Sequence, residues 1–122
     1  MSDTITMTIP AVRSYLRLPR VAIAGIATRS GFGFDEVEDL RLAIGEVCQI
    51  LLDGVDGDGE LVITFDVGER GSMTVDVTAP TPPLGKRAEN DISERLIAAS
   101  VGTVERSEDG RSIAFRKVAD ED

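Results

Sequence analysis

The hydrophobic positions between residues 34 and 54 follow the repeat of one face of a helix. The apolar side chains of this stretch are Val37, Leu40, Ala43, Ile44, Val47, Ile50 and Leu51. Asp35 and Glu38 precede most of them, three residues apart, as an N-cap and the second residue of a capping box would. The pattern predicts a long amphipathic helix around which the rest of the chain is organised.

Five stretches alternate between apolar and polar residues, which is typical of strands with one buried face. They are residues 4–9, 60–67, 72–78, 103–107 and 111–118. Residues 68–71 and 108–110 are short and glycine-containing, so the last four strands form two hairpins. Strands and helices in this order predict one α+β domain over residues 1–122, a two-layer sandwich. Its sheet is expected to be mixed, mostly antiparallel, with helices on one face.

Two further helices are expected, one before and one after the long helix in the sequence. Residues 19–30 carry a compact apolar face that ends at Gly31, and residues 91–101 carry a shorter one, capped by Asp91. Residues 79–90 contain three prolines and form a polar linker without regular structure.

The composition excludes several classes of function. The chain has a net charge of -9, which argues against binding to nucleic acid or to an anionic membrane. Histidine is absent and Cys48 is the only cysteine, so histidine-based catalysis and a zinc site are not expected. Cys48 borders the apolar stripe and is interpreted as a small buried hydrophobe. No secretion signal or membrane-spanning run is recognised, and we expect a cytoplasmic protein.

Three segments carry a family resemblance. They read T-I-T-M-T-I-P-A, R-V-A-I-A-G-I-A-T-R-S-G-F and D-E-V-E-D-L-R-L-A-I-G-E-V-C. In order and spacing they resemble the anti-sigma-factor serine kinases of the RsbW and SpoIIAB type, over about two thirds of the chain. This resemblance implies the histidine-kinase-like ATPase fold, known as the Bergerat or GHKL fold.

The resemblance also implies ATP chemistry, which this chain departs from. Glu46 matches the general base of the family, but Ile50 stands where an asparagine helps to hold Mg²⁺, and an aliphatic side chain is no ligand for that ion. Ala79 replaces the aspartate that binds adenine, and Thr81 replaces the glycine beside it. The ATP lid is shortened or missing, and Asp91 brings negative charge to the phosphate-binding turn. Glu46 is therefore interpreted as a vestigial base, and no cofactor or metal is expected.

Arg20 matches the arginine with which the family contacts both the sigma factor and its competitor, although an ordinary surface arginine would look the same. The leading hypothesis is a binding protein without enzymatic activity. It would sequester a sigma factor or bind an anti-anti-sigma (STAS) partner, and switch between partners in the regulation of bacterial transcription. The first strand and helix resemble the part through which such proteins form homodimers.

Two alternatives remain. One is an active serine protein kinase that binds ATP and Mg²⁺, uses Glu46 as base, and takes its metal ligands from Asp53 or Gln49. The other is a non-enzymatic decoy that pairs with an intact kinase paralogue.

Overall fold

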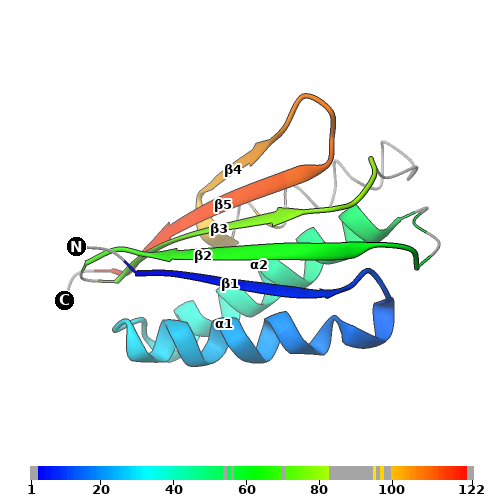
Figure 1. Ribbon diagram of the computed structural model, residues 1–122. Helices are drawn as coiled ribbons and strands as arrows, with labels where there is room; N and C mark the ends of the chain where they lie inside the picture. Colours follow the sequence, from blue (N-terminus) through cyan, green and yellow to red (C-terminus); the bar gives the residue numbers. More distant parts are fainter. Residues whose placement is uncertain are drawn as a thin grey trace.

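The protein is a five-stranded sheet with helices packed against one face, seen edge-on in Figure 1. The computed structural model describes residues 3–53, 55, 57–69, 71–82, 95, 97 and 100–120. The elements are β1 (Asp3–Pro10), the 3-10 turn η1 (Arg13–Tyr15), α1 (Arg17–Arg29), α2 (Phe34–Leu52), β2 (Glu60–Val67), β3 (Ser72–Thr78), β4 (Thr103–Arg106) and β5 (Ser112–Val118). The predicted α+β sandwich of two layers is confirmed.

The sheet differs from the expected mixed one, because every pairing between the described strands is antiparallel. The order is β1-β2-β3-β5-β4. β5 returns from its hairpin with β4 to lie beside β3 and runs opposite to it. β1 pairs antiparallel with β2 over their full lengths, from Asp3↔Val67 to Pro10↔Glu60. The prediction of a mixed sheet was wrong because alternation indicates which face of a strand is buried and not the direction of its neighbour.

The core lies between the sheet and α2, as the two periodicities predict. The strands contribute the buried side chains Ile9, Leu61, Ile63, Phe65, Met73, Val75, Val77, Ile113 and Phe115. The helix contributes Leu40, Ala43, Ile44, Val47, Cys48 and Leu51. Burial raises the pKa of the Cys48 thiol to about 12. The interpretation of Cys48 as a small buried hydrophobe is confirmed, and its thiol stays protonated at neutral pH.

The residues that begin α2 differ from those predicted. Gly33 is the N-cap, and its backbone N–H donates to Oε1 of Glu36 over 2.9 Å. Oε2 of the same carboxylate accepts from the backbone N–H of Asp120 over 2.8 Å. Glu38 instead pairs with Arg41, and Asp35 lies inside the first turn. The prediction of an Asp35 cap was wrong because Glu36 takes this role. Glu36 also binds the backbone of Asp120 near the C-terminal end, and local sequence does not show this contact.

Replacing Glu36 by glutamine should lower the free energy of unfolding by about 1–2 kcal/mol at pH 7, since the amide oxygen keeps one of the two hydrogen bonds in neutral form and the amide NH2 group cannot accept the other. The bond from Gly33 is the main reason that the pKa of Glu36 is lowered in the folded state. A lowered folded pKa adds stability above the unfolded value, and that stability is lost as the pH falls through the folded pKa. Urea unfolding at several pH values measures this. The difference in the free energy of unfolding between the wild type and Glu36→Gln should shrink in acid. Asp35→Asn is the control and should not show this pH-dependent difference.

Part of the third predicted helix is confirmed. Arg95, Ile97, Ser100 and Val101 are helical, and Ile97 and Val101 are buried. Lys117 of β5 donates from Nζ to the carbonyl oxygen of Ser100 over 2.8 Å, which fixes the end of this helix to the sheet. The predicted cap Asp91, the phosphate-binding turn at residues 90–93 and most of the linker lie outside the described residues.

Candidate functional site

Glu46 and Ile50 lie one turn apart on α2, and the structure separates their surroundings. The Ile50 side chain is only 4% exposed and belongs to the core. Glu46 is half-buried. The position at which the family resemblance places a Mg²⁺ ligand is thus filled by an aliphatic side chain that packs inward, beside a carboxylate that still reaches solvent.

Ala79, directly after β3, is buried and hydrogen-bonded to Arg111. Its side chain is 1% exposed, and its backbone N–H donates to the carbonyl oxygen of Arg111 over 2.8 Å. In return, Nε of Arg111 donates to the carbonyl oxygen of Ala79 over 3.1 Å. Thr81, two residues on, is exposed. Ala79, at the position that the family resemblance assigns to adenine binding, is therefore a core residue whose backbone groups are both paired.

Gln49 and Asp53, the alternative Mg²⁺ ligands, lie in different surroundings on α2. Gln49 is exposed and lines a groove shared with α1, and Asp53 is the half-buried C-cap of α2. Among the residues that the structure describes, no three cysteine or acidic side chains lie close enough together to hold a metal ion. Of the helices described, none is long and apolar enough to cross a membrane.

Arg20 lies in a groove of about 440 Å³ formed by η1, α1 and α2. Three more arginines line it, Arg13, Arg17 and Arg41, together with Ser14, Leu16, Val21, Gly45 and Gln49. We call this hollow the arginine groove. Sequence reasoning found Arg20 but missed the other three. One signal was present: residues 4–34 contain four arginines and no acidic residue.

Arg20 lies close to α2 at the arginine groove. A Cβ atom at Gly45 would lie 3.7 Å from Cδ of Arg20, an ordinary contact distance, so the stem of the arginine packs near the backbone of α2. Arg41, one turn earlier, donates from Nη1 to Oε1 of Glu38 over 3.0 Å. Its Nε atom is buried and has no hydrogen-bond partner among the described residues. The groove therefore concentrates the positive charge of four arginines.

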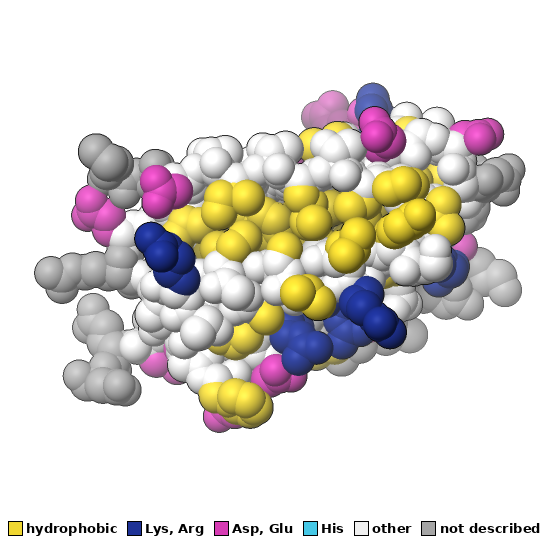
Figure 2. Space-filling view, turned by 60° about the horizontal axis from the view of Figure 1, so that its bottom comes forward, with side chains coloured by type: hydrophobic (Ala, Val, Ile, Leu, Met, Phe, Trp, Pro, Cys, Tyr) yellow, Lys and Arg dark blue, Asp and Glu magenta, His cyan; other side chains and the backbone are white. Residues whose placement is uncertain are grey.

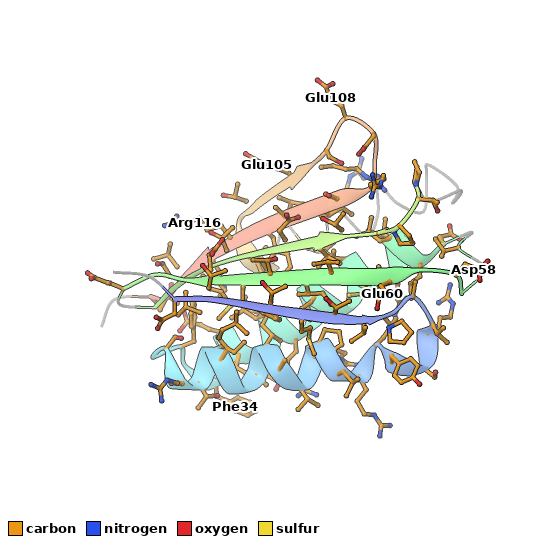
Figure 3. All side chains as sticks on the ribbon, viewed as in Figure 1. Phe34, Asp58, Glu60, Glu105, Glu108 and Arg116 are labelled. Atoms are coloured by element: carbon orange, nitrogen blue, oxygen red, sulfur yellow. The ribbon has the colours of Figure 1, made fainter. Side chains whose placement is uncertain are left out.

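Exposed apolar side chains accompany the arginines. Val21 lines the groove and is 62% exposed, while Leu18 and Leu42 are each 45% exposed. Figure 2 shows dark blue side chains beside a yellow band on the side that carries α1 and β1. Phe34, at the start of α2, is 80% exposed and projects away from the sheet (Figure 3). Arginine and aromatic side chains are enriched in protein interfaces.

Comparisons with known proteins agree with the resemblance seen in the sequence. The chain is 40% identical over 72 residues to the serine-protein kinase RsbW of Bacillus pumilus, a match that spans 55% of this chain and 44% of that protein. It is 37% identical over 71 residues to the serine-protein kinase RsbW of Bacillus subtilis, spanning 56% of this chain and 44% of that protein. The match thus spans less than half the length of these relatives. No protein-family model matches the chain.

A solved structure extends the likeness to almost the whole fold. The RsbU and RsbW domains of Rv1364c from Mycobacterium tuberculosis superpose with a TM-score of 0.74, over 96% of this chain and 32% of that chain. Sequence identity there is 14%, so this comparison speaks for the fold alone. Together these findings confirm the similarity to RsbW-type anti-sigma-factor kinases and the GHKL-like fold.

Proposed function

We propose, from this similarity to RsbW-type kinases, that the protein regulates transcription by binding and without ATP chemistry. It sequesters a sigma factor or binds a STAS anti-anti-sigma partner in the cytoplasm. One observation carries the proposal: two positions that the family resemblance assigns to Mg²⁺ and adenine hold Ile50 and Ala79, which are 4% and 1% exposed. Arg20, at the partner-binding position, is exposed in a groove instead.

Capture of partners tests this proposal. The purified chain should retain a sigma factor or a STAS protein from the source cells, and Arg20→Glu should weaken that binding about tenfold or more, since it replaces attraction by repulsion. Arg116→Glu is the matched control, because Arg116 lies on the strand layer away from α1 and α2 (Figure 3). If neither class of protein is retained, or if both variants behave alike, the sequestration proposal fails.

A homodimer through β1 and α1 is part of the proposal. β1 forms one edge of the sheet, and no described strand pairs with its outer side. Ile5 on this strand is 41% exposed, whereas Ile9 is 3% exposed. An edge strand with an apolar side chain at its rim suits pairing with a second copy. Sedimentation of the wild type against Ile5→Lys measures this association.

An active kinase is the second candidate, supported by the half-buried Glu46 and by the kinase names of the relatives. Titration calorimetry with ATP and Mg²⁺ separates the two. The binding proposal expects no heat up to millimolar nucleotide. Micromolar binding, with transfer of labelled phosphate to a STAS protein that Glu46→Ala abolishes, would establish the kinase instead.

A further inference from the structure

We infer that the arginine groove receives an acidic, amphipathic helix of the partner protein. This inference rests on the proposed function, because it names the chemistry by which that partner is held. It assigns the contact to the whole groove, including Arg13, Arg17 and Arg41, and so it extends beyond Arg20.

Charge gives the first argument. Residues 4–34 carry four arginines and no carboxylate, in a chain whose net charge is -9. Three of these arginines, Arg13, Arg17 and Arg20, meet Arg41 of α2 around the groove. A basic surface on an otherwise acidic protein orients an acidic partner toward this face and repels it elsewhere.

The guanidinium of Arg41 gives the second argument. Glu38 holds its Nη1 atom over 3.0 Å, yet the Arg41 side chain that lines the groove remains 37% exposed. A carboxylate of the partner can therefore reach the exposed part of this side chain. Arginine suits this task because its planar group can hold a carboxylate through two hydrogen bonds.

The apolar lining shows that a polypeptide suits the groove better than a small anion. Val21 lines the groove and is 62% exposed, and a phosphate ion would leave it uncovered. Arg41 and Gln49 line the groove eight residues apart, which is about 12 Å along α2, or two helical turns. A helix with acidic residues toward the arginines and aliphatic residues toward Val21 satisfies both sets of contacts.

The test uses the full chain and a synthetic peptide of about 20 residues, long enough to form a helix in water. The peptide carries glutamate on one helical face and leucine on the other, and a second peptide carries lysine in place of glutamate. Fluorescence anisotropy should show salt-sensitive binding of the acidic peptide alone. The triple substitution Arg13→Gln, Arg17→Gln and Arg41→Gln should weaken it about tenfold or more, whereas Arg116→Gln should not.

Amide NMR shifts locate the peptide and keep the test independent of folding. The expected shifts fall on η1, α1 and the exposed side of α2, and the spectrum of the triple variant should remain that of a folded protein. Val21→Ser should weaken the acidic peptide but not pyrophosphate. Equal binding of both peptides, shifts on the open face of the sheet, or pyrophosphate binding as tight as the peptide would each overturn the inference.

Two outcomes separate this inference from the proposed function. If a sigma factor or STAS protein is captured but the triple substitution leaves capture unchanged, the groove is not its binding site: the inference fails and the proposed function stands. If the acidic peptide binds at the groove while neither protein is captured, the inference that the groove binds an acidic helix stands and the proposed function fails. Binding to phosphatidylglycerol vesicles stronger than to the peptide would assign the groove to a membrane surface and overturn the inference.

Discussion

Ile50→Asn will lower the free energy of unfolding by about 3–5 kcal/mol and will not create an ATP site. This substitution restores the residue type that the family resemblance places at the Mg²⁺ position. Ile50 is 4% exposed, so its removal loses most of the free energy gained by burying it, which is about 1.5–3 kcal/mol. The new amide adds about 1–3 kcal/mol, because it is buried without designed hydrogen-bond partners.

Urea unfolding and calorimetry with ATP and Mg²⁺ measure the two parts of this prediction. Gln49→Asn is the matched control, since the neighbouring side chain is exposed and the change should cost only a few tenths of a kcal/mol in helix propensity. A loss below 1 kcal/mol for Ile50→Asn would show that the side chain at this position turns toward solvent. ATP binding by the variant would show that a nucleotide cleft persists, and either result would favour the kinase.

Gly59→Ala should lower the free energy of unfolding by about 2–4 kcal/mol, from backbone strain and from a collision. Gly59 precedes β2 with a φ of +89°, a left-handed conformation that disfavours any side chain. A Cβ atom here would lie 2.7 Å from Cβ of Pro80, which follows β3. The chain before β2 and the chain after β3 therefore approach each other so closely that only glycine fits.

Gly110→Ala separates the two causes. Gly110 has a φ of +76°, but a Cβ atom there would meet nothing within 4 Å. It should therefore cost only the backbone strain, about 1 kcal/mol. The difference between the two variants in thermal or urea unfolding gives the cost of the contact with Pro80. Equal losses would mean that the segment after β3 moves aside freely.

The local pattern was enough to predict most of the secondary structure. The predicted strands 60–67 and 72–78 have the bounds of β2 and β3, and the long helix was placed to within two residues of α2. These elements could be predicted because burial of one face produces a repeat of two in a strand and of 3.6 in a helix. The capping residue at the start of α2 could not be predicted in this way. Glu36 binds the backbone of Asp120, which lies far away in sequence.

The candidate site divides in the same way. Residue types alone predicted that Ile50 and Ala79 do not serve Mg²⁺ and adenine as the family residues do, and matching to the family predicted Arg20 as a partner contact. The groove itself escaped notice because Arg41 is surrounded in sequence by acidic residues and joins Arg13 and Arg17 only when α2 packs against α1. Charge that cancels along the chain can still be separated in space.

The sequence by itself determined the fold class and the central helix, because these depend on composition and short-range periodicity. Only the tertiary structure decided that the sheet is fully antiparallel, that Ile50 and Ala79 face the core, and that four arginines surround one groove. Each of these depends on which distant residues meet, and long-range contacts are set by the packing of whole elements rather than by the residues within one of them.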